Sequence, residues 1–312
     1  MKHLINLEGM STETRNPNTM HLDEMSIHEI LTIMNEEDQK VPLAIKKVLP
    51  QIEQAVTVID QAFKKGGRLI YIGAGTSGRL GVLDAAECVP TFGTSPEMVQ
   101  GLIAGGQEAM MFAVEGAEDS QEMAKVDLTA IELSADDVVV GIAASGRTPY
   151  VIGGLNYANQ VGAHTVSIAC NADSEIGKVA KIVIEAVPGP EVLTGSTRLK
   201  AGTVQKLILN MLSTVSMVKQ GKVYQNLMVD VQATNEKLVR RSQKIVCEAT
   251  GVSLEVAQQT LTESKGDVKT AILMIILEVD FETATTLLEK SEGHIREAIR
   301  LNNTNGGNEN GK

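Results

Sequence analysis

The hydrophobic pattern between residues 68 and 210 alternates between short apolar runs and longer amphipathic segments. The short runs are rich in β-branched and other aliphatic residues, as in strands buried on both faces of a parallel sheet; they lie at 68–72, 98–103, 138–144, 164–169 and 182–185. The longer segments carry apolar residues three and four positions apart, at 77–88, 120–131 and 150–160. This alternation predicts an α/β fold, a three-layer α/β/α sandwich around a parallel sheet.

Helical patterns precede and follow this region. Two helices are predicted before the first strand, from Ser26 to about residue 34 and over residues 42–64. A long helix is predicted at 201–220, and the pattern beyond Asn235 is helical throughout. The predicted divisions are an N-terminal arm and helix (1–40), the α/β domain (41–234), a small all-helical C-terminal domain (235–301) and a disordered tail (302–312). Residues 1–20 are expected to lie as an arm over another part of the chain.

Loops rich in glycine and hydroxyl groups follow two of the predicted strands. The first is Gly73-Ala74-Gly75-Thr76-Ser77-Gly78, where Ser77 is a predicted helix cap, and the second is Ser145-Gly146-Arg147-Thr148-Pro149. The carboxyl ends of parallel strands share one sheet edge, and free N–H groups at helix N-termini attract anions. The two loops together predict an anion site with Thr76, Ser77, Ser145 and Thr148 as donors. In the alternative interpretation, each hydroxyl only caps its own helix.

The first loop also fits the Gly-x-Gly-x-x-Gly dinucleotide fingerprint. That fold requires an acidic residue at the end of a second strand, about 20 residues further along the chain. The second predicted strand runs instead into Ala104-Gly105-Gly106. We therefore expect no nicotinamide or flavin cofactor.

The amino-acid composition argues against several kinds of partner and site. A formal net charge of −11 argues against nucleic acid or an acidic membrane surface as partner. Cys88, Cys170 and Cys247 lie far apart, without the spacing of a metal site or a disulfide framework. The most apolar run, residues 271–277, is much shorter than the roughly 18 residues of a membrane span. We expect a reduced, cytoplasmic protein with no membrane segment and no metal.

Several sequence blocks together resemble a known enzyme family. The two loops resemble the sugar isomerase (SIS) domain, a phosphosugar-binding α/β fold. More specifically, the chain is similar to the N-acetylmuramic acid 6-phosphate etherases in Glu37-Asp38, GAGTSGRLGVLDAAEC, EGAEDS, GIAASGRTPYV, TGSTRLKAGTVQK and NLMVDVQATNEKL. This resemblance covers nearly the whole chain, and the last helices resemble a ubiquitin-associated-like fold.

The resemblance implies a lyase that releases D-lactate from C3 of N-acetylmuramic acid 6-phosphate, in amino-sugar and cell-wall recycling. In the open-chain aldehyde, a base removes the C2 proton, an acid protonates the departing lactyl oxygen, and water adds at C3. By their positions in DAAEC and EGAEDS, Glu87 corresponds to the proton donor and Glu118 to the base. No metal or redox cofactor is implied. Glu115 is a rival to Glu118, and periodicity does not choose between them.

Glu87 ends a largely apolar helix beside Ala86 and Cys88, so we expect it to be partly buried, as suits a general acid. The plain alternative is that both glutamates are solvated surface acids. The expected ligand-binding residues are Gly75, Thr76, Ser77, Ser145, Gly146, Arg147, Thr148 and Ser196. Weaker candidates are Arg198, Lys200 and Lys206.

Two other classes of function remain open at this point. A non-catalytic sugar-phosphate sensor would resemble the glucokinase regulatory protein, and an aldose–ketose isomerase would need no acid at O3. The presence of both Glu87 and Glu118 favours the lyase. We expect a homodimer, because sites of the SIS type are commonly built where two chains meet.

Overall fold

The computed structural model describes residues 10–112, 114–231 and 236–306. The chain divides into two compact units, residues 1–86 with 96–213 and residues 87–95 with 214–312. The predicted boundary between the α/β and helical domains, after residue 234, lies outside the described residues. The predicted domain limits therefore stay a prediction.

A parallel sheet in the order β2-β1-β3-β4-β5 forms the centre of the first unit, so the predicted α/β sandwich is confirmed. The two strands nearest the N-terminus, β1 and β2, each begin one residue later than predicted, and β4 and β5 have the predicted limits. The strands are β1 (Leu69–Gly73), β2 (Val99–Ile103), β3 (Val138–Ile142), β4 (His164–Ala169) and β5 (Ile182–Glu185).

The strand order reverses between β1 and β3. These two strands pair in parallel with Gly73 opposite Ile142, whereas the chain runs from β1 outward to β2 and from β3 outward to β4. Open α/β sheets bind ligands in the crevice at such a switch point, beyond the carboxyl ends of the strands. Both loops rich in glycine and hydroxyl groups begin there.

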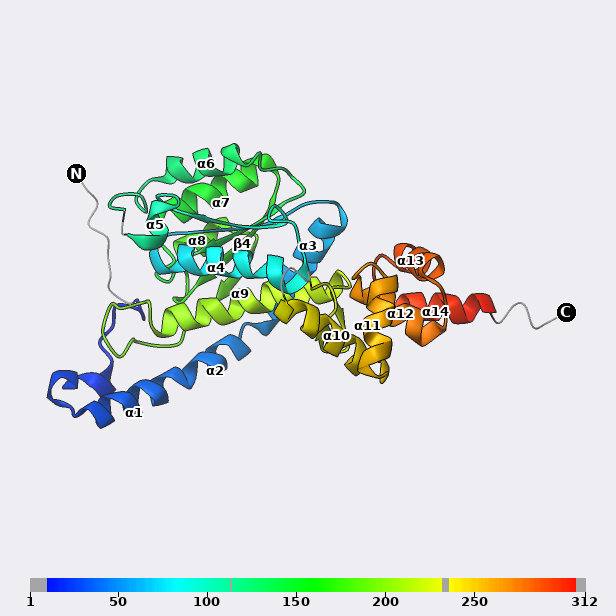
Figure 1. Cartoon of the computed structure of the whole chain (residues 1–312). Helices are drawn as coiled ribbons and strands as arrows, with labels where there is room; N and C mark the ends of the chain where they lie inside the picture. The colour runs from blue at the N-terminus through cyan, green and yellow to red at the C-terminus, as the bar shows by residue number, and fades with distance from the viewer. Residues whose placement is uncertain (1–9, 113, 232–235, 307–312) are drawn as a thin grey trace. The chain divides into compact units, whose positions relative to one another are not determined.

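Helices cover both faces of the sheet (Figure 1). On one face, α6 (Gln121–Ala130) and α7 (Pro149–Val161) enclose a core that contains Ile70, Ile72 and Val139. On the other face, α4 (Gly75–Phe92) packs on Tyr71 through Gly81, and α9 (Lys200–Lys219) lies beside α4. The other helices of this unit are α1 (Ile27–Asp38), α2 (Lys40–Lys46), α3 (Leu49–Lys64), α5 (Glu108–Met111) and α8 (Glu175–Val179).

A buried aspartate fixes α4 in place. Asp84 accepts hydrogen bonds from the Tyr71 hydroxyl on β1 at 2.9 Å and from Nδ2 of Asn210 on α9 at 2.7 Å. Because Asp84 is buried, these partners replace the water that its carboxylate loses on folding. The middle of α4 is thereby held against both the sheet and α9.

Two helix limits differ from the prediction for local reasons. The helix predicted over residues 42–64 is two helices, because Pro50 lies in the first turn of α3 and its ring would clash with the carbonyl group of Lys46 in a continuous helix. Helix α4 begins at Gly75, so Ser77 lies inside its first turn and the prediction that Ser77 caps it was wrong. Ser26 does cap α1, which continues to Asp38.

The N-terminal arm lies over the loops that follow β4 and β5. The backbone N–H of Thr12 donates to Oδ1 of Asn171 at 3.3 Å, and the Thr19 hydroxyl donates to the carbonyl of Val192 at 2.9 Å. The predicted arm is confirmed for these residues. Residues 1–9 of the arm lie outside the described residues.

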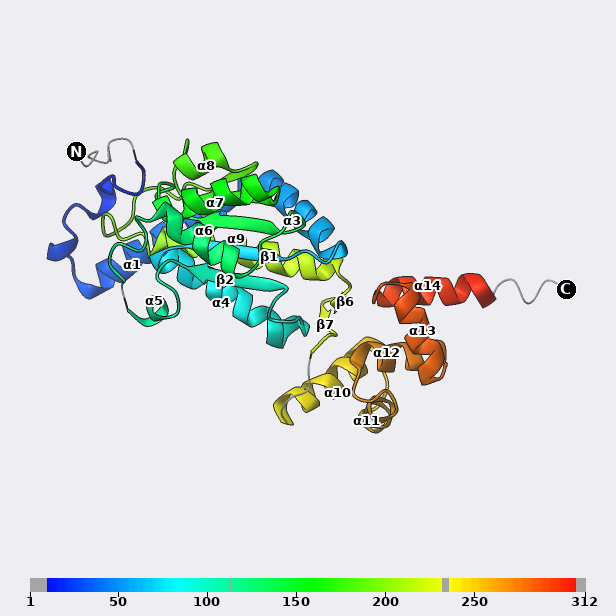
Figure 2. The same cartoon turned by 90° about the horizontal axis from the view of Figure 1, so that it is seen from above.

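Within the described residues, the second unit contains a short hairpin and helices α10 to α14, together with the ends of α4 and α9 (Figure 2). The hairpin was not predicted. Helix α14 continues to Gly306, beyond the predicted end near Leu301, and residues 307–312 of the predicted tail lie outside the described residues. No helix in the described part of the chain is long and apolar enough to cross a membrane. The elements are β6 (Val223–Tyr224), β7 (Leu227–Met228), α10 (Glu236–Thr250), α11 (Leu254–Glu263), α12 (Val268–Leu277), α13 (Phe281–Lys290) and α14 (Ile295–Gly306).

The close approach of α6 and α7 gives a test of the packing. A Cβ atom at Gly153 would lie 2.2 Å from the carbonyl oxygen of Gln121. We expect Gly153→Ala to lower the free energy of unfolding in urea by about 1–3 kcal/mol, because α6 must move. In the matched control Gly202→Ala, the nearest atom is 3.5 Å away, so stability should be kept or raised by up to about 1 kcal/mol. Equal losses in both variants would contradict the packing.

Candidate functional site

The hydroxyl groups of the two loops do not simply cap their own helices. The Ser77 hydroxyl donates to Oε1 of Gln205 on α9 at 2.9 Å, and Thr148 precedes α7 without a side-chain capping bond. Ser145 Oγ accepts a hydrogen bond from the backbone N–H of Arg147 at 3.3 Å, which closes the second loop. The alternative capping interpretation therefore does not describe Ser77 or Thr148.

The loop that follows β5 also reaches this area. A methyl group on Gly202 would lie 3.5 Å from Cγ2 of Thr76 and 3.6 Å from the carbonyl oxygen of Thr197. Predicted Ser196 is half-buried in this loop, next to Thr197. The fold thus brings the loop after β1, the loop after β5 and the start of α9 together.

A cavity of about 320 Å³ lies between the start of α4, the end of β2 and residues 109, 112 and 114–118. Of the predicted site residues, Gly75, Glu115 and Glu118 line it, together with Arg79. The cavity wall does not include the other predicted binding residues, which are Thr76, Ser77, Ser145, Gly146, Arg147, Thr148 and Ser196.

Glu118 lies between the cavity and the second loop. Its backbone carbonyl accepts a hydrogen bond from the N–H of Tyr150 at 3.0 Å, and Tyr150 lies in the first turn of α7. Glu115 lines the same cavity, and both carboxylates are exposed. Both glutamates therefore remain candidates for the base. Of the two, only Glu118 has a backbone hydrogen bond to α7.

Glu87 is exposed, so the expectation that it is partly buried was wrong for this chain. Helix α4 buries Ala85 and Cys88, whereas Ala86 and Glu87 lie on its solvent side. Leu83, one turn before Glu87, is also 51% exposed. Apolar neighbours in the sequence did not predict the burial of Glu87, because only one face of α4 packs against the protein.

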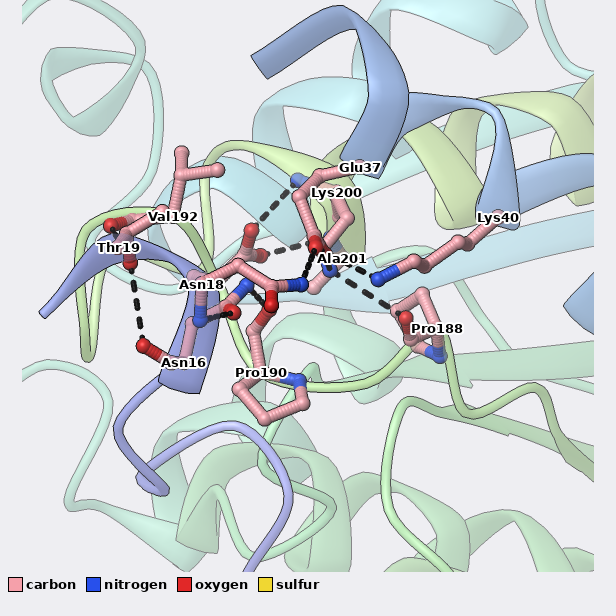
Figure 3. Close-up of polar contacts among 11 residues, drawn as sticks. Asn16, Asn18, Thr19, Glu37, Lys40, Pro188, Pro190, Val192, Lys200 and Ala201 are labelled. Carbon is pink, nitrogen blue, oxygen red and sulfur yellow. Dashed lines mark hydrogen bonds and ion pairs between the residues drawn. The ribbon is translucent and has the colours of Figure 1, made fainter. Parts of the chain in front are cut away.

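A buried ion pair joins the N-terminal helices to α9 (Figure 3). Nζ of Lys200 lies 2.6 Å from Oε2 of Glu37, and both side chains are at most 2% exposed. Burial alone would raise the pKa of Glu37, but hydrogen bonds from Lys200, Lys40 and Asn18 outweigh it and lower the pKa to about 2. Lys200 was a weak candidate for ligand contact, and its ammonium group is engaged in this pair instead.

The N-terminus of α9 is occupied by a carboxylate of the protein itself. Glu191 accepts hydrogen bonds from the backbone N–H groups of Lys200 and Ala201, both at 2.9 Å. Burial raises the pKa of Glu191, although these two N–H groups act in the opposite direction. The start of α9 is therefore already occupied, whereas the start of α7 has no side-chain capping bond.

Sequence reasoning missed two polar residues of this area, Arg79 and Gln205. Arg79 follows Gly75 by four residues, so helical spacing within the first loop motif would have placed both on one face. Nε2 of the buried Gln205 has no hydrogen-bond partner among the described residues. The position of Gln205 beside Ser77 depends on tertiary packing alone, so no local sequence signal predicts it.

No cluster of three His, Cys, Asp or Glu residues that could hold a metal occurs within the described ranges.

The parallel sheet and the loops at its switch point have the architecture of an α/β protein of the SIS class. Residues 51–159 match the glucokinase regulatory protein N-terminal SIS domain, and residues 110–215 match the SIS domain.

Similar proteins define the family more narrowly. The chain is 63% identical to the N-acetylmuramic acid 6-phosphate etherase of Exiguobacterium sp., over 94% of this chain and 100% of the relative. It is 62% identical to N-acetylmuramic acid 6-phosphate etherase 2 of Lactiplantibacillus plantarum and of Enterococcus faecalis, over 95% of this chain and 100% of each relative. The chain belongs to the N-acetylmuramic acid 6-phosphate etherase family.

The buried ion pair gives the prediction of this section. In Lys200→Met, Glu37 would stay buried with only Asn18 and the half-exposed Lys40 as partners, so we expect the free energy of unfolding to fall by about 3–5 kcal/mol. The matched control Lys40→Met removes the other lysine from the same carboxylate. Because Lys40 is 50% exposed, its loss should cost less than about 1 kcal/mol in the same urea titration. If both variants lose the same stability, the buried pair does not have the role assigned to it.

Proposed function

We propose that this chain is a carbon–oxygen lyase that cleaves the D-lactyl ether of N-acetylmuramic acid 6-phosphate. The products are N-acetylglucosamine 6-phosphate and D-lactate, and the role is amino-sugar recycling in the cytoplasm. The observation that carries this proposal is identity of 62–63% with etherases over their whole length. The loops at the switch point and the cavity lined by Glu118 support it.

In this proposal, the phosphate group binds at the N-termini of α4 and α7. Backbone N–H groups and the positive ends of both helix dipoles favour a dianion there. Gly75 and Gly146 have φ angles of +52° and +73°, a conformation that favours glycine and allows the backbone close to a ligand. The proposed phosphate-binding residues are Gly75, Thr76, Ser77, Ser145, Gly146, Arg147, Thr148 and Ser196.

The proposed reaction is an elimination followed by hydration. Glu118 removes the C2 proton, which the C1 aldehyde of the open-chain sugar makes acidic, and the electron pair forms the C2–C3 double bond. The C3–O bond breaks, and the lactyl oxygen takes a proton from Glu87. Water then adds its hydroxyl to C3 and a proton returns to C2, so no electrons leave the sugar.

We propose that the enzyme works as a homodimer. Leu83 and Glu87 lie one turn apart on α4 and are both exposed in the single chain. A second chain packed against this part of α4 would cover Leu83 and remove Glu87 from bulk water. Such an environment suits a general acid better than full exposure does.

A non-catalytic sugar-phosphate sensor is the second candidate. The match of residues 51–159 to the glucokinase regulatory protein domain favours it, because that name describes a regulator. The presence of Glu87 and Glu118 in one chain favours the lyase, since a sensor needs neither a base nor an acid.

D-lactate release from N-acetylmuramic acid 6-phosphate, measured with a chelator present, tests the proposed reaction. The wild type should release lactate, and Glu87→Gln and Glu118→Gln should each lower kcat by about 10²–10⁴-fold, because each removes one proton-transfer group. Glu115→Gln is the matched control on the same cavity wall, and it should stay within about tenfold of the wild type.

The possible failures have separate meanings. If Glu115→Gln abolishes turnover while Glu118→Gln retains it, the base is Glu115. If folded wild type binds the phosphosugar and releases no lactate, the etherase proposal is wrong and the sensor is favoured.

A further inference from the structure

We propose that Arg79 binds the carboxylate of the lactyl group and thereby distinguishes the substrate from its product. This inference rests on the proposed etherase function. Arg79 lines the same cavity as Glu118, and it is half-buried on the first turns of α4. The substrate class is a sugar phosphate that carries a second anionic group, a carboxylate, on the C3 oxygen.

The position of Arg79 relative to Glu118 decides which anion it meets. Glu118 has to reach the hydrogen on C2, and the lactyl group hangs from the adjacent carbon, C3. Arg79 lines the cavity that Glu118 lines, so we place it near the lactyl group. The phosphate is on C6, three carbons beyond C3, and the loops at the N-termini of α4 and α7 are proposed to hold it.

The guanidinium group of Arg79 is held in place and still has donors to offer. Its Nε donates to the backbone carbonyl of Met110 at 3.0 Å. Within the described residues, no hydrogen bond or ion pair involves its two Nη nitrogens, even though Glu115 and Glu118 line the same cavity. Two parallel N–H groups on a fixed plane match the geometry of a carboxylate.

The charges of the side chains that line the cavity also favour a carboxylate as the ligand of Arg79. Two carboxylates line it, and Arg79 is the only positively charged side chain among the described lining residues. A third carboxylate would be repelled by both glutamates unless a cation compensates for it. The cavity is partly enclosed by apolar side chains such as Ala104 and Phe112, which strengthens a charge-assisted hydrogen bond by lowering the local dielectric constant.

Binding measurements on a protein with strongly reduced turnover separate the two anionic groups. We would measure Kd by calorimetry for N-acetylmuramic acid 6-phosphate and N-acetylglucosamine 6-phosphate in Glu118→Gln and in Glu118→Gln with Arg79→Gln. Both ligands carry the phosphate, and only the first carries the lactyl carboxylate. Loss of Arg79 should weaken the first ligand by about 10- to 100-fold, because two charge-assisted hydrogen bonds are lost, and leave the second within about twofold.

Two further variants complete the test. Ser145→Ala on the same background is the phosphate-side control, and it should weaken both ligands by the same factor. Arg79→Lys keeps the positive charge but lacks the two parallel N–H groups of the guanidinium. It should therefore weaken the binding of N-acetylmuramic acid 6-phosphate less than Arg79→Gln does. If Arg79→Gln does not fold, Arg79→Lys carries the same comparison, and a selective loss of the first ligand is still required.

The results separate this inference from the proposed function. Equal weakening of both ligands, or no weakening of either, would overturn the role of Arg79, whereas lactate release by the wild type would still support the etherase. Absence of lactate release would refute the etherase itself, whatever the variants bind. Retained binding of N-acetylglucosamine 6-phosphate by the Arg79 variants also demonstrates that the site is folded.

Discussion

The parallel pairing of β1 with β3 is the constraint on which the rest of the site depends. It sets Gly73 opposite Ile142, so the two loops rich in glycine and hydroxyl groups leave the sheet side by side. Helices α4 and α7 then start from neighbouring strands and lie on opposite faces, with both N-termini directed to one edge. The backbone carbonyl of Glu118 accepts a hydrogen bond from the N–H of Tyr150 at the start of α7, so the backbone of this glutamate is also fixed at the same edge.

Buried charged residues hold the loop after β5 and the start of α9 at this edge of the sheet. Glu191 occupies the N-terminus of α9, and the pair of Lys200 with Glu37 holds α9 to the N-terminal helices. Such groups are costly to bury, and they persist here because each charge has hydrogen-bond partners on several segments. These contacts anchor the start of α9, the helix whose Gln205 accepts a hydrogen bond from the Ser77 hydroxyl of α4.

Local sequence signals were enough to predict the sheet, both loops and the arm. Apolar runs, glycines and capping residues act over a few positions, so residues 164–169 and 182–185 could be predicted to the residue as β4 and β5. Pro50 was read as part of a longer helix, although its missing N–H divides that helix in two.

Contacts between distant segments were beyond the reach of such signals. Glu37 and Lys200 are 163 positions apart, and no periodicity connects them. The exposure of Glu87 depends on which face of α4 meets the protein, and the placement of Arg79 in the cavity depends on the positions of residues 109, 112 and 114–118. Family resemblance indicated the two glutamates, whereas the geometry adds the cavity that one of them shares with an arginine.

The most direct test of the account is the fate of the hydrogen on C2 when the reaction runs in D₂O. Glu118 is exposed, so a proton that it takes from C2 exchanges with solvent before one is returned. The account predicts that the released N-acetylglucosamine 6-phosphate carries one deuterium at C2, detected as the loss of the C2 proton signal by NMR. Product that retains its original hydrogen at C2 would contradict elimination through C2 and, with it, the role proposed for the cavity beyond the carboxyl ends of β1 and β2.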